Sequence, residues 1–273
     1  MYARHLESPQ NPEIKAVARL KERRARKAER RFLIEGAREL SRALEAGAAV
    51  DRIYLCEALY SDEARELASR LETERVTTVS QAAFEKLSMR EGPDGVLAVA
   101  PIPQADLSRL SLPPEALVLV LEGLEKPGNL GALLRTADGV GVDAVFVTGP
   151  GTDLYNPNTV RASMGSLFTQ SVLQVEPEAL LTFLQQQGFS LVAATPHADT
   201  VYWDANYAGR VAVALGAEHD GLSPQLRGAA SQQVVIPMRG AADSLNVGTA
   251  GALLLYEALR QRGFPNKQVI NPV

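Results

Sequence analysis

The sequence is poor in the residues that build disulfides and metal sites. It contains one cysteine, Cys56, and three histidines among its 273 residues. A single cysteine excludes an internal disulfide and a zinc site built on cysteines. No stretch reaches the roughly 18 uninterrupted apolar residues that a membrane span needs. The basic N-terminus lacks the apolar segment of a secretory signal. We therefore expect a cytoplasmic protein with no membrane span and no metal.

Several familiar catalytic and nucleotide-binding patterns are also missing. There is no Walker A sequence, and no G-x-G-x-x-G follows a first strand. The segment 161–165 reads Arg-Ala-Ser-Met-Gly and lacks the first glycine of a hydrolase nucleophile elbow. None of the three histidines is paired in sequence with a plausible nucleophile. These absences argue against phosphate-cradling loops, acyl transfer and metal chemistry.

The net charge of −4 is distributed unevenly. Residues 1–35 hold ten Lys and Arg against five Glu, a local charge of +5, so the remainder carries −9. The cations fall on a helix-forming stretch with a narrow apolar stripe, which predicts a helix that presents them outward. Such a helix is either a solvated surface or a contact to an RNA phosphate backbone. The candidate RNA-binding residues are Arg19, Arg23, Arg26, Lys27, Arg30 and Arg31.

Two domains are expected, and both are of the α/β class. In residues 1–100, helix candidates at 35–46, 62–71 and 81–87 alternate with strand candidates at 50–56, 76–79 and 95–100. Prolines then mark residues 101–114 as a linker.

Residues 115–263 predict a parallel-sheet domain, followed by a tail at 264–273. The strand candidates are nearly continuous apolar runs, typical of strands buried on both faces of a parallel sheet. These strands are 117–121, 142–147, 190–194, 211–215 and 233–236. Helices are expected at 129–140, 157–166, 177–187, 223–230 and 246–261. The last helix is apolar on nearly all sides, so we expect its own domain and a partner subunit to cover it.

The most informative segment runs from Ile236 to Gly248. A strand ending in proline leads into a glycine-rich loop, and Ser244 and Asn246 then stand at the start of a helix. This order is typical of a backbone loop shaped around a small ligand. Asn246 also has a purely structural interpretation as a helix cap, worth about 1 kcal/mol.

Two upstream segments carry further polar residues. In 124–137, Asn129 is expected at a helix start and Arg135 nearly two turns later, partly facing inward. In 215–223, a strand runs into an acidic loop that contains Glu218. Loops at the carboxyl ends of parallel strands are where α/β proteins bind ligands. The alternatives are a helix cap for Asn129, a surface cation for Arg135 and a surface turn for the acidic loop.

Taken together, the three segments resemble the signature motifs of SpoU-type RNA 2′-O-ribose methyltransferases of the SPOUT superfamily. The matching patterns are N-x-G-x-x-x-R-T-A at 129–137, L-G-A-E-x-x-G-L-S at 215–223 and I-P-M-x-G-x-x-x-S-L-N-V at 236–247. Residues 15–100 resemble the ribosomal-protein-like substrate-binding domain that often precedes this catalytic domain. The resemblance implies S-adenosylmethionine as cofactor, a deep trefoil knot, and a homodimer with active sites near the subunit interface.

The resemblance also implies roles for individual residues. The catalytic positions would be Asn129, Arg135, Glu218, Ser244 and Asn246. The cofactor would be held by Thr195, Gly216, Ala217, Ile236 and Leu245. Arg135 is the residue proposed as general base in the family. A guanidinium normally stays protonated, so anchoring a phosphate and stabilising developing alkoxide is the alternative role.

The sequence departs from the usual pattern at two positions, Gly248 and Lys126, where serine and aspartate are common. All five polar site positions are intact, which favours an active enzyme over a non-catalytic RNA-binding or ribosome-assembly protein. The N-terminal module favours ribosomal RNA of the 23S type as substrate. The alternative substrate is tRNA.

Overall fold

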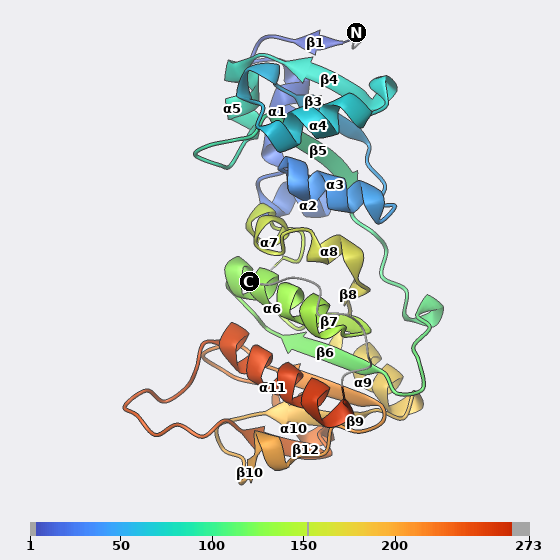
Figure 1. The fold of residues 1–273 in the computed structure, drawn as a ribbon, viewed down its shortest axis with the longest axis vertical. Coiled ribbons are helices and arrows are strands. Elements are labelled where there is room, and N and C mark those ends of the chain that lie inside the picture. Colours follow the sequence, from blue (N-terminus) through green and yellow to red (C-terminus); the bar gives the residue numbers. More distant parts are fainter. Residues whose placement is uncertain (1–3, 152, 264–273) are drawn as a thin grey trace. The chain divides into compact units, whose positions relative to one another are not determined.

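The computed structural model describes residues 4–151 and 153–263. The predicted tail at 264–273 lies outside the described residues. The described chain forms two compact units, each built around its own sheet. Unit 1 comprises residues 4–104, 126–131 and 153–169, and unit 2 comprises the rest (Figure 1).

Unit 1 contains a five-stranded sheet of order β1-β4-β3-β5-β2. Its strands are β1 (His5–Leu6), β2 (Arg31–Glu35), β3 (Arg52–Leu55), β4 (Val76–Val79) and β5 (Val96–Pro101). Its helices are α1 (Pro12–Arg19), α2 (Arg23–Glu29), α3 (Ala37–Glu45), α4 (Asp62–Arg70), α5 (Gln81–Leu87), α7 (Pro157–Ala162) and α8 (Ser166–Thr169). Two 3-10 turns, η1 (Glu57–Leu59) and η2 (Thr73–Arg75), complete the unit.

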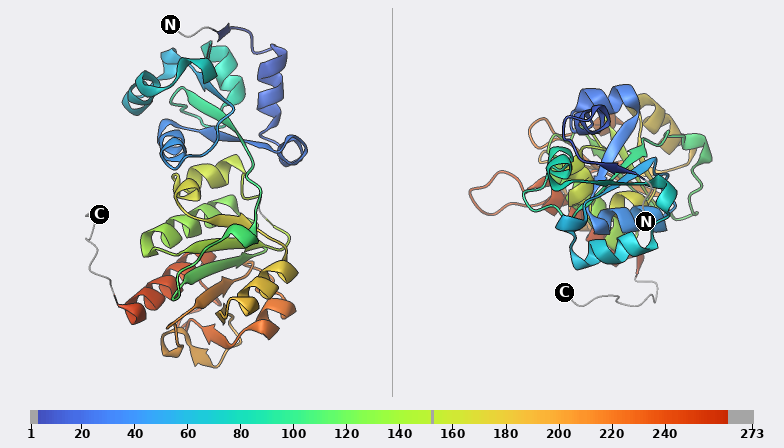
Figure 2. Two further views of the ribbon diagram at one scale, coloured as in Figure 1. Left: turned by 90° about the vertical axis from the view of Figure 1, so that its right-hand side faces the viewer. Right: turned by 90° about the horizontal axis from the view of Figure 1, so that it is seen from above.

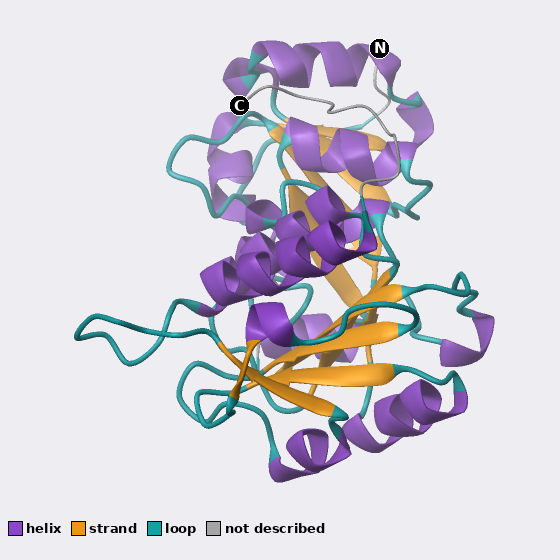
Figure 3. Ribbon diagram, turned by 60° about the horizontal axis from the view of Figure 1, so that its bottom comes forward, coloured by secondary structure: helices purple, strands orange, loops and turns teal. Residues whose placement is uncertain are grey.

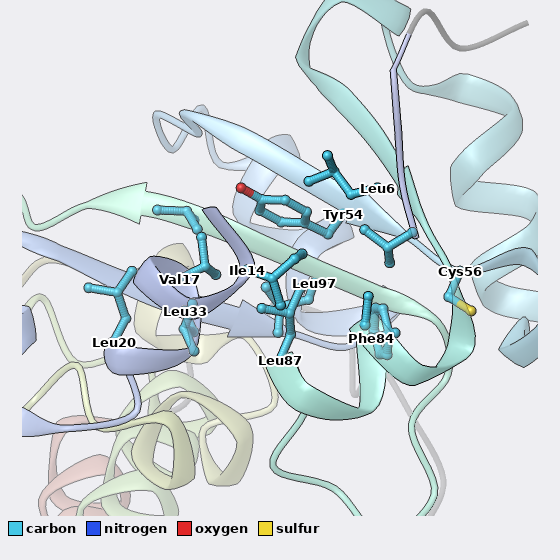
Figure 4. Packing of buried hydrophobic residues seen from close by; sticks show 13 residues of the cluster. Leu6, Ile14, Val17, Leu20, Leu33, Tyr54, Cys56, Phe84, Leu87 and Leu97 are labelled. Carbon is cyan, nitrogen blue, oxygen red and sulfur yellow. The ribbon is translucent and has the colours of Figure 1, made fainter. Parts of the chain in front are cut away.

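The core of unit 1 joins the first helix to α5 and the sheet. Ile14 of α1 and Phe84 of α5 are both fully buried, together with Leu97 of β5 (Figure 4). Burying an aliphatic or aromatic side chain of this size stabilises a fold by about 1.5–3 kcal/mol. The N-terminal helix therefore belongs to the packed core of this unit.

The basic stretch does not form the single helix that its composition predicts. It forms α1 and α2, separated at Leu20–Glu22. Arg26 explains part of the break, because its Nη1 donates to the carbonyl oxygens of Leu20 and Lys21, both at 2.7 Å. Carbonyl groups at a helix C-terminus lack partners within the helix, so this guanidinium satisfies them.

Strand β2 is not among the predicted elements, since the basic stretch ends at Arg31 and the next predicted helix starts at Glu35. It pairs antiparallel with β5 along its whole length, from Arg31 opposite Pro101 to Glu35 opposite Leu97. Four of its five residues are buried. A short strand covered on both faces carries no alternation that would distinguish it from a helix.

Unit 2 contains a seven-stranded sheet of order β10-β12-β9-β11-β6-β7-β8. All of its pairings are parallel, as the apolar runs predict. Its strands are β6 (Leu117–Glu122), β7 (Ala144–Thr148), β8 (Val172–Gln174), β9 (Ser190–Ala194), β10 (Thr200–Val201), β11 (Val211–Leu215) and β12 (Gln232–Val235). Its helices are α9 (Pro177–Gln186), α10 (Pro224–Ala229) and α11 (Val247–Arg262), with 3-10 turns η3 (Leu107–Arg109) and η4 (Tyr202–Asp204).

Helices cover both faces of this sheet (Figure 3). On one face, Leu180 of α9 and Leu226 of α10 join a buried cluster with Val118 and Phe146 of the strands. On the other face lie α11 and the part of α6 (Pro127–Val140) that belongs to unit 2. The predicted α/β class and parallel sheet are thus confirmed. Among the described residues, no helix combines the length and apolar character needed to cross a membrane.

Candidate active site

The segments predicted to hold the cofactor follow three neighbouring strands of the unit 2 sheet. Thr195 comes directly after β9, Gly216 directly after β11, and Ile236 directly after β12. Because β12, β9 and β11 are adjacent and parallel, their carboxyl ends lie at one edge of the sheet. The structure therefore brings these three segments together where parallel α/β sheets bind ligands.

The loop after β11 folds back on itself. The backbone of Ala217 pairs with that of Gly221 through two hydrogen bonds, of 3.2 and 2.9 Å. A Cβ placed on Gly216 would lie 2.1 Å from the Gly221 carbonyl carbon, so this position accepts only glycine. The second motif is a closed loop held by backbone contacts, and Glu218 is exposed on it.

Close contacts join the third motif to the helix of the first. A Cβ on Gly251 of α11 would lie 2.2 Å from Leu133 Cδ2 of α6 and 2.9 Å from Leu215 Cδ1 of β11. One turn earlier on α11, Gly248 faces Ala132 of α6. Helices α6 and α11 therefore run side by side within unit 2, as Figures 1 and 2 show.

The first two motifs are joined at the carboxyl end of β6. Gly123 follows this strand with φ of +68°, and a Cβ on it would lie 3.6 Å from Ala217 Cβ. The preceding residue, Glu122, is 6% exposed, and its Oε2 accepts a hydrogen bond from the Ser223 backbone at 2.6 Å. Sequence reasoning missed Glu122. The available signal was an acidic residue at the end of an otherwise apolar strand.

The polar residues of the third motif stand at the N-terminus of α11. Asn246 is the N-cap, and its Oδ1 accepts a hydrogen bond from the Gly248 backbone at 2.9 Å. The predicted capping role is therefore confirmed. Ser244 lies on the preceding loop and is exposed. Leu245 between them is half-buried.

Helix α6 begins at Pro127, two residues before the predicted start. Asn129 is its third residue and is half-buried. Arg135 is exposed, so the expectation that it partly faces inward is wrong. The two residues are six positions apart, which corresponds to about 9 Å along the helix axis.

The predicted RNA-binding cations divide into two groups. Arg26 is 1% exposed, and its Nε and Nη2 both lie 2.9 Å from Asp153 Oδ2. The expectation that Arg26 points outward is therefore wrong, because its guanidinium is used inside unit 1. The other five are exposed: Arg19, Arg23, Lys27, Arg30 and Arg31.

A cofactor with an adenine ring and a charged amino-acid part fits the residues at the sheet edge. Thr195 is buried, and Gly216, Ala217, Ile236 and Leu245 are half-buried. This lining offers apolar side chains for a ring and backbone groups for polar atoms. Among the described residues, no group of three His, Cys, Asp or Glu is placed to hold a metal ion.

Two relatives match along most of their own length. The 23S rRNA (uridine(2479)-2′-O)-methyltransferase of Streptomyces viridochromogenes is 33% identical, over 85% of this chain and 83% of that protein. The 23S rRNA (guanosine(2553)-2′-O)-methyltransferase RlmP of Bacillus subtilis (strain 168) is 31% identical, over 93% of this chain and 98% of that protein.

Solved structures match over both units. A crystal structure of an RNA 2′-O ribose methyltransferase is 47% identical, covers 94% of this chain and 99% of that chain, and superposes with a TM-score of 0.82. The SpoU methyltransferase AviRb from Streptomyces viridochromogenes, in complex with the cofactor AdoMet, is 30% identical with a TM-score of 0.84. That match covers 92% of this chain and 99% of AviRb.

The two parts of the sequence match two separate families. Residues 11–98 match the MRM3-like substrate binding domain. Residues 116–256 match the SpoU rRNA Methylase family, and this stretch contains all three motifs. The resemblance predicted from those motifs is confirmed. This chain belongs to the SpoU rRNA Methylase family.

Proposed function

We propose that this protein transfers a methyl group from S-adenosylmethionine to a ribose 2′-hydroxyl of 23S ribosomal RNA. The observation that carries the proposal is the convergence of the three motif segments, which follow β6, β11 and β12, at one edge of the parallel sheet. Contacts at Gly123, Gly248 and Gly251 join these segments. The same segments lie within residues 116–256, which match the SpoU rRNA Methylase family.

Ribosomal RNA is favoured over tRNA by the match along both domains. Two 2′-O-methyltransferase relatives that match more than four fifths of this chain act, by name, on 23S rRNA. Residues 11–98 match a substrate-binding domain, so the chain carries a surface for RNA in addition to the methyltransferase domain. A ribosomal substrate also places the protein in the cytoplasm.

Each catalytic residue has a defined task in the proposed reaction. The bound cofactor supplies a methyl group on a positively charged sulfur. The 2′-oxygen would bond to this methyl as the carbon–sulfur bond breaks, which leaves a neutral thioether, and the hydroxyl proton would pass to solvent water. Arg135, exposed on α6, anchors the phosphate beside the target ribose and stabilises the negative charge that develops on the oxygen. Ser244 and Asn246 orient the 2′-hydroxyl from the start of α11, and Glu218 acts from the loop after β11. Asn129 is assigned to the same reaction by its position in the first motif.

Cofactor binding is assigned to the sheet edge. Ile236, Leu245 and Ala217 would hold the adenine, and the backbone at Gly216 and Thr195 would bind the polar atoms of the cofactor. Isothermal titration with S-adenosylmethionine tests this assignment. We expect saturable binding, and no heat at about millimolar cofactor would contradict the enzyme function, because such affinity is near the weak limit for a specific site.

RNA binding is assigned to the exposed cations at the end of the basic stretch. Lys27, Arg30 and Arg31 are exposed near the start of β2, together with Arg19 and Arg23. Each cation that neutralises a phosphate releases a counterion, so affinity falls steeply with salt. Charge reversal at Arg23 and Lys27 should weaken RNA binding and reduce its salt dependence.

A homodimer is proposed from the exposed face of α11. Leu253 and Tyr256 are 36% and 52% exposed, and they line a groove with Tyr202 and Thr249. Large apolar side chains grouped on one helix face are typical of a protein interface. Light scattering should report a dimer for the intact protein and a monomer for Leu253→Glu.

We propose the domain boundaries and the knot from the resemblance to the same family. The domains are residues 1–100 and 115–263, joined through 101–114, and the C-terminal segment is threaded as a deep trefoil knot. Within this segment, α11 packs through Gly251 on Leu215, the residue directly before the tight loop at Gly216–Gly221. Pulling the chain from both ends should give a contour length shorter than the sequence allows, because a knot shortens it.

Mapping 2′-O-methyl groups tests the function as a whole. RNA from cells that lack the gene should have lost one methylated ribose in 23S rRNA, and purified protein with S-adenosylmethionine should restore it. Loss of a methyl group in tRNA instead would assign the alternative substrate. No loss in either RNA would contradict the proposed activity.

A further inference from the structure

Arg26 is the most deeply buried charged side chain in unit 1, and its partner comes from far along the sequence. Its guanidinium contacts Asp153, 127 positions later, through Nε and Nη2, while Nη1 contacts the carbonyls of Leu20 and Lys21. A guanidinium in this arrangement uses its forked geometry, which a lysine ammonium does not reproduce. The ion pair therefore joins a residue of the 11–98 substrate-binding match to a residue of the 116–256 methyltransferase match.

Asp153 in turn shapes the start of α7. Its Oδ1 accepts from the backbone of Tyr155 at 3.0 Å, and its carbonyl accepts from Asn156 at 2.9 Å. Asn156 is the N-cap of α7 and accepts from the Asn158 backbone at 2.9 Å. One carboxylate oxygen therefore binds the guanidinium while the other holds the turn that leads into the helix.

Further contacts hold the same segment on the N-terminal sheet. The ring of Phe32 lies 4.6 Å from that of Tyr155 and 6.3 Å from that of Phe168, so it touches both ends of the segment. The Arg42 guanidinium donates to the Met164 carbonyl. Met164 has φ of +50°, a backbone conformation that non-glycine residues rarely adopt without support from their surroundings.

Helix α7 contacts the first turns of α6. A Cβ on Gly131 would lie 2.4 Å from Ala162 Cβ and 2.8 Å from the Ser163 nitrogen, so the two backbones meet there without room for a side chain. Asn129 precedes Gly131 by two residues on the same helix. A shift of α7 would therefore displace the start of α6, which carries Asn129.

We infer that Arg26 and Asp153 are positioning residues for the methyl-transfer step. The ion pair holds residues 153–169 against the N-terminal sheet, and this segment fixes the start of α6 and thus the placement of Asn129. The inference rests on the proposed function. It assigns to one cation of the basic stretch a task that differs from RNA binding.

The test uses full-length protein and compares Arg26→Lys and Asp153→Asn with wild type. Arg26→Lys keeps the positive charge but removes the forked contact of the guanidinium. Asp153→Asn keeps the side-chain size but removes the negative charge. We expect kcat for methylation of 23S rRNA to fall about tenfold or more, since small misplacements of reacting groups carry large costs. The Kd for S-adenosylmethionine should stay within about twofold, because its proposed site follows β9, β11 and β12.

Salt dependence separates positioning from RNA contact. If Arg26 bound a phosphate, Arg26→Lys would keep activity, and removing the charge would lower the salt slope of log Kd by about one. A positioning role predicts the opposite pair of results. The kcat of Arg26→Lys should be lower than that of wild type, and the salt slope of log Kd should not change when the charge is removed. An altered slope with an active lysine variant would overturn the inference.

Asp51→Asn is the matched control. Asp51 Oδ2 pairs with Arg31 Nε at 2.7 Å in the same unit, but both side chains are more than one third exposed. We expect wild-type kcat for this variant. An equal loss of kcat in the control and in Asp153→Asn would overturn the inference, because a general weakening of the unit would then explain both.

A second readout does not depend on catalysis. Amide hydrogen exchange should accelerate at α7 and at the first turn of α6 in Asp153→Asn but not in Asp51→Asn. Should a single variant not fold, the neutral pair Arg26→Met with Asp153→Asn removes both charges together, which buried pairs tolerate better. Unchanged exchange and unchanged kcat in that pair would overturn the inference. A wild-type protein that methylates no RNA would instead contradict the proposed function.

Discussion

Glu122 Oε2 accepts a hydrogen bond of 2.6 Å from the backbone nitrogen of Ser223. Glu122 ends β6, and Ser223 is the N-cap of α10. The bond therefore ties the strand before the first motif to the last residue of the second. A buried carboxylate that accepts a backbone N–H makes a charge-assisted bond, which is stronger than a neutral one.

Glu122→Ala should loosen the closed loop between Gly216 and Ser223. We expect weaker binding of S-adenosylmethionine and a loss of about 1–3 kcal/mol in the free energy of unfolding, because a partly buried N–H loses its acceptor. Titration calorimetry and denaturant unfolding measure the two effects.

The opposite end of β6 supplies the control for Glu122. Asp143 Oδ2 accepts from the Leu117 backbone at 2.8 Å, at the amino end of the strand. Asp143→Ala should lower stability but leave cofactor affinity intact. Equal cofactor affinity in the two variants would contradict a specific role for Glu122.

Much of the fold follows from the sequence pattern. Strands β9 and β11 and helix α5 have the predicted bounds, because long apolar runs and regular helical spacing are strong local signals. The short strands β8 and β10 were missed. Their residues are half-buried or exposed, so no apolar run marks them.

The candidate site was harder to predict than the fold. The motifs gave the residue types, but their convergence depends on glycine contacts between distant segments, such as Gly251 against Leu133. The burial of Arg26 was equally unpredictable. Nothing in a run of cations shows which one meets a carboxylate 127 positions away.

Gly131→Ala should destabilise the protein through the contact of α6 with α7. The added Cβ would lie 2.8 Å from the Ala162 carbonyl carbon, and that backbone cannot move aside at small cost. We expect a loss of about 1–3 kcal/mol, typical of overpacking. Gly128→Ala is the control, since nothing lies within 4 Å of its Cβ. Thermal unfolding should show a lower midpoint for the first variant and an unchanged or higher one for the second.

Asn246 caps α11 and is proposed to act in catalysis, and two substitutions separate these two roles. Asn246→Ala should lose both the cap of α11, worth about 1 kcal/mol, and methylation activity. Asn246→Asp keeps an acceptor for the Gly248 backbone but removes the amide donor, so stability should be retained while activity falls.

A cap elsewhere in the chain controls for the loss of stability at Asn246. Ser61 caps α4 by accepting from Ala64 at 3.1 Å. Ser61→Ala should lower the unfolding midpoint and leave activity unchanged. Full activity in Asn246→Asp would show that the amide has no catalytic role.

Tyr155 should make the protein less stable at alkaline pH. Burial is the main cause that raises the pKa of its hydroxyl to about 12. The folded state favours the neutral hydroxyl of Tyr155. Its contribution to the free energy of unfolding is therefore complete below the ordinary pKa of about 10 and is lost as the pH rises towards 12. A shift of this size corresponds to about 2–3 kcal/mol.

Comparing Tyr155→Phe with wild type between about pH 8 and 11 measures this contribution, because the window spans the onset of tyrosine ionisation. The unfolding free energy of the variant should fall less with pH. Phe168→Leu alters the same aromatic cluster without changing a titrating group, so it should follow the wild-type pH dependence. Parallel curves for Tyr155→Phe and wild type would contradict the assignment.

Substitutions of Arg135 distinguish between an electrostatic role and a general-base role for this residue. Arg135→Ala should lower kcat by about 10²–10³, the usual cost of removing a group that stabilises developing charge. Arg135→Lys keeps a cation, so an electrostatic role predicts substantially more activity than in the alanine variant and an unchanged pH profile.

A role of Arg135 as general base predicts a different result. A lysine amine loses its proton far more readily than a guanidinium, so kcat would acquire a new dependence on pH. The pH profile of kcat for both variants, with cofactor affinity measured in parallel, decides between the two roles.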